Sequence, residues 1–428
     1  MEIERTYGML GVCPKVYEFG EAVLNDLKAR FEEIDRTAEC NQAKVLHAMQ
    51  KNRVSAQCFA ATTGYGYDDI GRDTLERIFA RLFHAEAAIV RPSIACGTAA
   101  LSLCLFGLLR PGDHLLSATG APYDTMQTVI GVAGNAPGNL KEMKVDYSQV
   151  EMTADQQAID VDGVLAALRP NTRVVLIQRS RGYAWRASLL PRDMAALITR
   201  VHALRPDVFI MVDNCYGAFT CEDEPTFFGV DVCVGSLIKN AGGGLAPTGA
   251  YLAGTQKAIA RIEGSLTAPG LGREVGSYAA SYQPFYQGLF MAPHTVVQAL
   301  KTSVLAARVF ALLGMKTTPA FDAPRSDIIQ AIELGSPEGM VAFCRGIQAA
   351  SPIDGSAVPE PWEMPGYQDK VVMAAGTFVS GASIELSADG PLRAPYTIYM
   401  QGGLTYAHGK IALVEALEKM AQAGCLKE

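Results

Sequence analysis

The sequence predicts an α/β fold, in which a large domain with a mostly parallel β-sheet covered by helices is followed by a smaller α+β domain. Between residues 87 and 253, short apolar runs typical of buried strands alternate with helical patterns. At 428 residues the chain is too long for one simple core and suits one large and one smaller domain. After about residue 290 prolines become frequent and the regular alternation stops.

The elements of the large domain follow in order along the chain. Apolar side chains at helical spacing over residues 16–51 lead us to assign residues 1–60 to an N-terminal helical segment. A glycine-rich loop over 60–71 precedes a helix at about 72–85, and the large domain spans 61–295. The last two of its expected strands are close enough in the chain to pair antiparallel. These strands lie at 88–90, 114–116, 174–177, 208–212, 232–234 and 250–252.

The smaller domain is expected over residues 296–428. It should open with a helix near 296–313 and close with a helix at 410–423. Between them, alternating residues predict strands at 370–374 and 382–386.

Composition excludes several function classes. The net charge of −7 argues against nucleic acid or an anionic membrane as the main partner. The polar start lacks the apolar core of a signal peptide, and the longest apolar stretch, 94–109, is short for a membrane span. The ten cysteines and six histidines form no CxxC or HExxH pattern, so we expect no metal and no disulfide framework. These features fit a cytoplasmic protein.

Two charged side chains follow neighbouring predicted strands. Asp213 ends the run 208–212, and Lys239 closely follows the run 232–238 and precedes three glycines. A carboxylate and a lysine so placed are the two groups that pyridoxal phosphate (PLP) needs. The amine condenses with the cofactor's aldehyde, and the aspartate keeps the pyridine nitrogen protonated. Each residue alone could instead be an ordinary strand-end Asp or a lysine with its charge in solvent.

A phosphate group needs backbone N–H donors at the start of a helix. Gly97 and Thr98 stand in a small-residue stretch between a predicted strand and an apolar helix, where Gly97 allows close approach and Thr98 adds a hydroxyl. Ser236 could supply a second hydroxyl. Such a helix start is more often only a packing solution. The sequence has neither a GxGxxG nor a GxxxxGK[ST] motif, so dinucleotide and P-loop sites lose support.

Four further residues are candidates for cofactor or substrate contacts. Tyr123, in the loop after 114–116, could stack on a flat ring, or only anchor its loop. Tyr67, in the glycine-rich loop, could reach the cofactor phosphate of a neighbouring subunit. Arg393, in the smaller domain, could hold a substrate carboxylate with its planar fork, and Arg179 is the alternative. Either arginine could instead make a structural ion pair.

These motifs resemble the fold-type I PLP enzymes of Cys/Met metabolism, and within them the methionine γ-lyase-like or aluminium resistance branch (cystathionine β-lyase-like). The similarity runs nearly end to end. It rests on the segments 63–69 (TGYGYDD), 178–183 (QRSRGY), 212–217 (VDNCYG), 235–240 (GSLIKN), 242–249 (GGGLAPTG) and 401–406 (QGGLTY).

The resemblance implies a seven-stranded, mostly parallel sheet, PLP as the cofactor, and a homotetramer built as a dimer of dimers. It also implies Lys239 as the Schiff-base lysine, Asp213 at the ring nitrogen and Tyr123 as the stacking ring, with Gly97, Thr98 and Ser236 at the phosphate. The chain departs from its relatives at three positions. Asp69 stands where better-known enzymes have a phosphate-binding arginine, with Arg72 the nearest replacement, and Cys96 and Ala218 differ from the branch pattern. The departures at Cys96 and Ala218 concern the substrate and not the cofactor.

The expected function is a lyase that removes a thiol or halide from a small amino-acid substrate by β- or γ-elimination. A thiol would make it a cystathionine or methionine lyase, and a halide on an unsaturated substrate could yield an alkyne. Burial and the cofactor should lower the pKa of Lys239, which then abstracts the α-proton. The alternatives are a γ-replacement synthase or aminotransferase on the same fold, or a PLP-binding protein without turnover.

Overall fold

The computed structural model describes residues 2–364 and 369–426. The chain divides into two compact units, one of residues 40–292 and one of residues 1–39 with 293–428. The division falls within α3 (Lys28–Lys51) and α10 (Gln283–Leu312). The upper boundary lies close to the expected one at 295, whereas residues 1–60 do not form a segment of their own.

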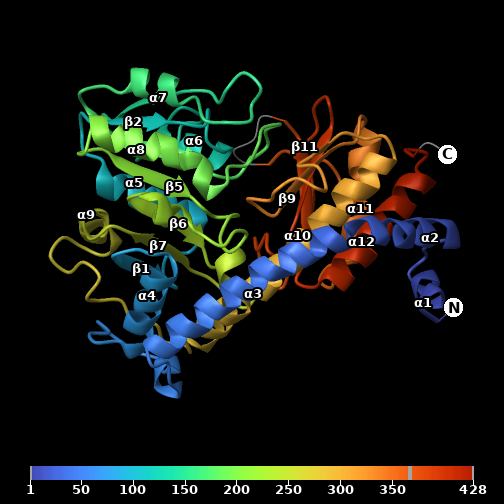
Figure 1. The fold of residues 1–428 in the computed structure, drawn as a ribbon, viewed down its shortest axis with the longest axis horizontal. Coiled ribbons are helices and arrows are strands. Elements are labelled where there is room, and N and C mark those ends of the chain that lie inside the picture. Colours follow the sequence, from blue (N-terminus) through green and yellow to red (C-terminus); the bar gives the residue numbers. More distant parts are fainter. Residues whose placement is uncertain (1, 365–368, 427–428) are drawn as a thin grey trace. The chain divides into compact units, whose positions relative to one another are not determined.

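The larger unit is built on a seven-stranded sheet (Figure 1) with the strand order β1-β7-β6-β5-β4-β2-β3. Strands β2 to β6 pair in parallel, and β7 pairs antiparallel with both β1 and β6. The predicted antiparallel pair is therefore confirmed. The strands are β1 (Ala87–Arg91), β2 (His114–Ser117), β3 (Asp146–Gln149), β4 (Thr172–Gln178), β5 (Phe209–Asp213), β6 (Val232–Ser236) and β7 (Ala250–Gly254).

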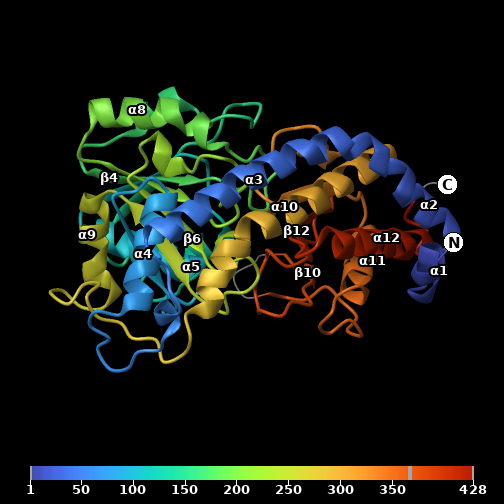
Figure 2. The same cartoon turned by 60° about the horizontal axis from the view of Figure 1, so that its bottom comes forward.

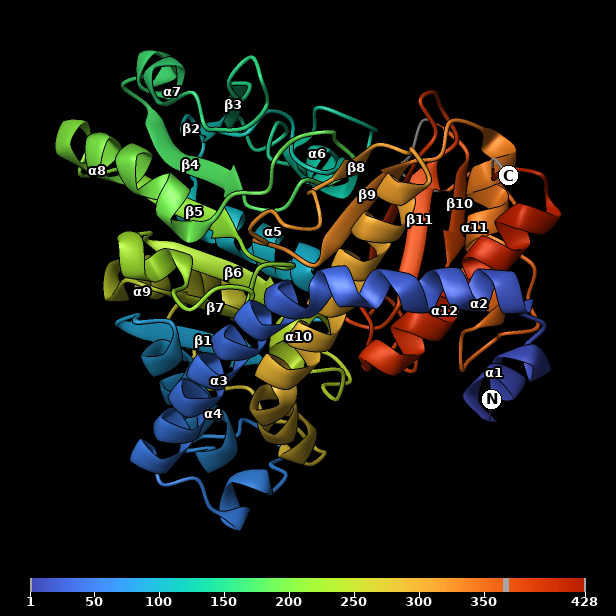
Figure 3. The same cartoon turned by 45° about the vertical axis from the view of Figure 1, so that its right-hand side comes forward.

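Helices cover both faces of this sheet because successive residues of its strands point to opposite sides. Met211 packs in the core that contains the helix residues Leu105 and Ile259, whereas Ile210 packs in the core that contains Leu197. Figure 3 shows β4, β5, β6 and β7 as neighbouring arrows. The helices of this unit are α4 (Ile70–Leu82), α5 (Gly97–Leu108), α6 (Asp124–Ile130), α7 (Val161–Ala167), α8 (Ala195–Leu204) and α9 (Gln256–Leu266), with the short 3₁₀ helices η2 (Ala56–Phe59), η3 (Pro191–Met194), η4 (Pro225–Phe228) and η5 (Asn240–Gly242).

The smaller unit contains a five-stranded antiparallel sheet with the order β10-β11-β12-β9-β8. Helices α11 and α12 pack side by side next to it (Figure 2). Its elements are α1 (Glu2–Met9), α2 (Pro14–Ala22), η1 (Val23–Leu27), β8 (Thr317–Thr318), β9 (Ile329–Glu333), α11 (Pro337–Ala349), β10 (Val371–Ala374), β11 (Ser387–Pro391), β12 (Thr397–Gln401) and α12 (Tyr406–Gln422).

Several sequence predictions about the elements were incomplete or wrong. Strand β3 was missed, because its polar sequence DYSQ lies at the sheet edge and is half-exposed. Residues 382–386 form no strand, since Glu385 instead accepts the backbone N–H groups of Phe378 and Val379. The strand begins at Ser387, and β8, β9 and β12 were not expected.

Helix α10 starts at Gln283, well before the predicted residue 296. Within the part of the chain that the structure describes, it is the one helix long and apolar enough to cross a membrane by length and composition. Because 72% of its most apolar window is buried, α10 packs as a core helix does.

Candidate active site

Asp213 and Ser236 are the last residues of the adjacent parallel strands β5 and β6. Lys239 follows three residues later, in the turn before η5. Because the carboxyl ends of parallel strands share one edge of the sheet, these side chains gather at the edge where α/β folds bind ligands. The structure therefore brings Asp213, Ser236 and Lys239 to one place, as the sequence predicted.

The environment of Lys239 differs from the expected one. Its Nζ atom lies 3.8 Å from the centroid of the Tyr216 ring. Burial lowers the pKa of Lys239, but the electrostatic effects of Tyr216, Cys215, Asp213 and Tyr123 outweigh burial, and the pKa is raised. Burial therefore lowers the pKa as expected, but in the protein chain by itself the neighbours outweigh it; the effect of a bound cofactor stays a prediction.

Asp213 is buried, and burial raises the pKa of its carboxyl group. Hydrogen bonds and nearby positive charges oppose that shift by favouring the carboxylate. The backbone N–H of Cys215 donates to Oδ1 at 3.0 Å, and the charge of Lys239 lies nearby. A positive charge on a bound ligand would favour the carboxylate further. The Asp213 carboxylate is therefore suited to pair with a pyridinium nitrogen.

The start of α5 lies against the ends of β5 and β6. A Cβ atom on Gly97 would come within 2.7 Å of Cys215 Sγ and 3.4 Å of Ser236 Cβ, so no side chain fits there. The Ser236 hydroxyl is buried and has no hydrogen-bond partner among the described residues. An unpaired buried hydroxyl beside the free N–H groups of a twelve-residue helix fits a phosphate group.

Tyr123 directly precedes α6 and joins this group. Its hydroxyl lies 2.8 Å from Thr98 Oγ1, and its backbone N–H donates to Gln178 Oε1 at 2.8 Å. Burial, Asp213 and Cys215 raise the pKa of its phenol. The tyrosine is thus a neutral, anchored ring beside the helix start, where a flat cofactor could stack.

The glycine-rich loop presents Tyr67 to solvent. The Tyr67 side chain is 59% exposed, and its ring stacks on Tyr65 with centroids 5.5 Å apart. Arg72, the suggested replacement for a phosphate-binding arginine, is buried and donates to the carbonyl oxygens of Gly66 and Gly276. Arg72 therefore fixes the loop from within, and a contact of Tyr67 with a neighbouring subunit's cofactor stays a prediction.

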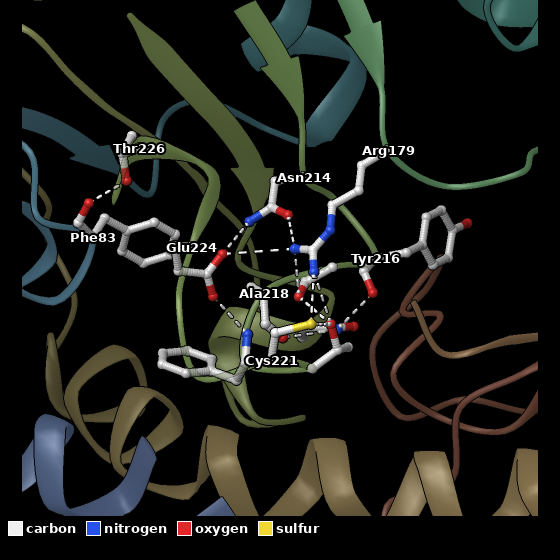
Figure 4. Close-up of polar contacts among 12 residues, drawn as sticks. Phe83, Arg179, Asn214, Tyr216, Ala218, Cys221, Glu224 and Thr226 are labelled. Atoms are coloured by element: carbon white, nitrogen blue, oxygen red, sulfur yellow. Dashed lines mark hydrogen bonds and ion pairs between the residues drawn. The ribbon is translucent and has the colours of Figure 1, made fainter. Parts of the chain in front are cut away.

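Arg179 is 1% exposed and lies in a buried network (Figure 4). Its five N–H groups match five hydrogen bonds that all end on protein atoms. The acceptors are Leu189 O, Asn214 Oδ1, Gly217 O, Thr220 Oγ1 and Cys221 Sγ. This arrangement leaves no donor for a substrate carboxylate, which counts against that role for Arg179.

Arg393 belongs to the smaller unit, between β11 and β12. Its side chain is 56% exposed and its Nη1 lies 3.0 Å from Asp369 Oδ2. Among the residues that the structure describes, this ion pair engages only Nη1, which leaves the other donors of the guanidinium group available to a ligand. Its role at a substrate carboxylate stays a prediction.

Sequence reasoning missed Tyr216 and Cys215, which both lie near Lys239. The available signal was their position directly after Asp213, since residues that leave the carboxyl end of a central strand border the ligand edge. In the described residues, no cluster of three or more His, Cys, Asp or Glu side chains could hold a metal ion.

The chain belongs to the methionine gamma-lyase family, whose model matches residues 16–421. This is a family of PLP-dependent enzymes that resemble carbon–sulfur lyases. The uncharacterized protein YnbB of Bacillus subtilis is 50% identical over 398 residues, 93% of this chain and 94% of YnbB.

Solved structures agree with this assignment. The carbon-sulfur lyase involved in aluminum resistance from Clostridium novyi NT has a TM-score of 0.93 and 44% identity, covering 97% of this chain and 98% of that one. A candidate cystathionine beta-lyase involved in aluminum resistance from Listeria innocua has a TM-score of 0.92 and 46% identity, covering 95% and 99%. The pyridoxal-5'-phosphate dependent protein YhfS from Escherichia coli, at 18% identity and a TM-score of 0.61 over 91% and 97%, shows the fold alone. The fold is that of the fold-type I PLP enzymes.

Proposed function

We propose that this protein is a PLP-dependent lyase that eliminates a thiol from an amino acid by breaking a carbon–sulfur bond. The observation that carries the proposal is the convergence of Asp213, Lys239 and the unpaired Ser236 hydroxyl at one edge of the sheet. The similarity to a carbon-sulfur lyase over nearly the whole chain supports a thiol as the leaving group.

The chain has a group suited to each part of the cofactor: the aldehyde, the ring nitrogen and the phosphate. The Lys239 amine would condense with the aldehyde, and Asp213 would pair with the ring nitrogen. The N–H groups at the start of α5 would hold the phosphate, with the hydroxyls of Thr98 and Ser236. When bound, PLP supplies an electron sink that stabilises negative charge on the carbon next to the substrate's amine.

The chain's own residues then handle protons and charge. Once a substrate's amine has taken the place of Lys239, Nζ of Lys239 would be free to take the α-proton. Its surroundings favour the charged amine, so Nζ holds that proton and can deliver it to the departing sulfur. Asp213 would pair as a carboxylate with the ring nitrogen, and Tyr123, anchored through Thr98, would stack on the ring.

The experiment combines cofactor mapping with substrate screening. Purified protein loaded with PLP is reduced with borohydride, and the labelled peptide should contain Lys239. Incubation with cystathionine, methionine and cysteine should release a keto acid, ammonia and a thiol from at least one of them.

Variants test the two assigned roles. Lys239→Ala should lose the label and all turnover, whereas Lys257→Ala, a lysine on α9, should keep both. Asp213→Asn should bind PLP yet lose at least about a hundredfold in kcat, because the ring nitrogen is no longer held protonated. A label on another lysine would refute the site. Transfer of the amine to an added keto acid without ammonia release would indicate an aminotransferase instead.

A further inference from the structure

The ring of Tyr216 covers the amine of Lys239. A separation of 3.8 Å between Nζ and the ring centroid is well within the range of a cation–π contact, which extends to about 6 Å. The ring is half-buried, and it stands on the loop that leaves Asp213. One segment therefore carries both Asp213, a proposed cofactor ligand, and an aromatic face on the proposed catalytic amine.

The residue after Lys239 fixes that loop in place. The buried Asn240 donates from Nδ2 to the carbonyl oxygens of Tyr216 at 2.9 Å and Ala218 at 3.0 Å. The lysine and the ring that covers it are thus joined through two hydrogen bonds of the adjacent side chain. Their spacing is a built feature of the fold.

The buried network of Figure 4 holds the same loop from its other side. Arg179 donates to Gly217 O at 2.9 Å and to Asn214 Oδ1 at 2.6 Å, and Asn214 Nδ2 donates to Glu224 Oε2 at 2.8 Å. A Cβ atom on Gly217 would come within 2.3 Å of Arg179 Nη1, so no side chain fits at this position beside the network. The ring of Tyr216 points away from this network in Figure 4.

We propose that Tyr216 is a positioning residue whose ring face holds Nζ of Lys239 in its charged form. The proposal rests on the proposed lyase function for its catalytic meaning, because that function makes Lys239 the proton carrier. The other groups that face the amine are Asp213 and Cys215 on the same segment and Tyr123 from the loop before α6. Together with Tyr216 they raise the pKa of Lys239.

The test measures the reactivity of Lys239 in the full-length chain freed of cofactor. Acetic anhydride acylates only the neutral amine, so the rate at a fixed, mildly alkaline pH reports the fraction of Nζ that is uncharged. Mass spectrometry follows the peptide with Lys239 and, as an internal reference, the exposed Lys141.

Removing the ring should lower the pKa of Lys239 by about one unit and speed its acylation about tenfold relative to Lys141. Tyr216→Leu provides that change, and Tyr216→Phe, which keeps the aromatic face, should stay within about twofold of wild type. Trifluorophenylalanine at position 216 keeps the shape but weakens the negative face. It should therefore move the rate in the same direction as leucine, without altering access to the amine.

In the enzyme loaded with PLP, Tyr216→Leu should shift the acid limb of the kcat–pH profile to lower pH by about one unit. An unchanged Lys239 rate in the fluorinated protein would overturn the proposal, and so would a Phe variant as fast as the Leu variant. The acylation rates do not depend on turnover. An active lyase with unchanged rates refutes Tyr216 alone, whereas shifted rates in a chain without lyase activity refute the proposed function alone.

Discussion

The larger unit contains two buried arginine–glutamate pairs. They differ in how completely the nitrogen atoms of the arginine are hydrogen-bonded. In one, Arg179 Nη1 and Glu224 Oε2 are 3.8 Å apart, and Asn214 hydrogen-bonds to both partners. In the other, Arg91 Nη2 and Glu76 Oε1 are only 3.1 Å apart, yet Nε and Nη1 of Arg91 have no partner among the described residues. The closer pair is therefore the less well satisfied one.

In these two pairs, the hydrogen bonds around the ions, more than the distance between them, determine how well the buried charges are stabilised. Burial raises the pKa of both glutamates. The pair with Glu224 lies in a network that fixes a loop beside Lys239. The pair with Glu76 leaves charge poorly compensated, since burial also lowers the pKa of Arg91.

The largest effect should follow from removing the arginine of the satisfied pair. Arg179→Met should lower the free energy of unfolding by about 3–5 kcal/mol, because Glu224 and the carbonyl oxygens of Leu189 and Gly217 lose their buried partner. Denaturant unfolding of the folded protein measures this loss. The double variant Arg179→Met/Glu224→Leu should recover part of it, and a double variant no more stable than the single one would contradict the pairwise explanation.

A smaller, pH-dependent effect should appear at the unsatisfied pair. Burial raises the pKa of Glu76 from 4.5 to about 7, so the folded state binds this proton more tightly than the unfolded chain. The stability contributed by protonated Glu76 is present below pH 4.5 and is lost as the pH rises to about 7, by on the order of 3 kcal/mol.

Glu76→Gln should remove this decline. The difference in unfolding free energy between wild type and variant, measured at a series of pH values, should therefore grow in favour of the variant as the pH rises. Glu263→Gln, at a partly exposed partner of Arg273, is the matched control for the loss of a carboxylate. If the difference in unfolding free energy between wild type and Glu76→Gln did not change with pH, Arg91 would fully compensate the charge of Glu76.

The smallest effect on stability is expected at the exposed pair of Arg393 and Asp369. An exposed ion pair contributes about 0–1 kcal/mol, so Arg393→Ala should scarcely change the unfolding free energy. If Arg393 binds the substrate carboxylate with two hydrogen bonds, kcat/KM should nevertheless fall about a hundredfold. Asp369→Ala removes the same pair but keeps the arginine, and equal losses in both variants would exclude a substrate contact of Arg393.

The sequence was sufficient for the central part of the site because continuous apolar runs reveal buried parallel strands. Asp213 and Lys239 follow such runs, so their meeting at one sheet edge could be predicted. The charge state of Lys239 could not, because it depends on the side chains of Tyr216 and Cys215, which only the folded loop places around the amine.

The smaller unit was harder to predict because tertiary contacts override local preference there. Residues 382–386 (ASIEL) have a strand-like pattern but are held by the contacts of Glu385. The following segment, 387–391 (SADGP), has poor strand propensity and yet forms β11. Pairing with β10 and β12 on both sides explains that choice.

The strand order of the larger sheet sets an order of events during synthesis. Strands β4, β5 and β6 are neighbours both in the sheet and in the chain, so the part that carries Asp213 and Lys239 can associate as soon as it leaves the ribosome. Strand β1, which leads into the start of α5, has β7 as its sole sheet neighbour within the described chain, and β7 is made more than a hundred residues later. The start of α5 is therefore made early, but the strand before it gains its sheet neighbour only when β7 follows β6 and Lys239, so both parts of the site are completed at nearly the same point of synthesis.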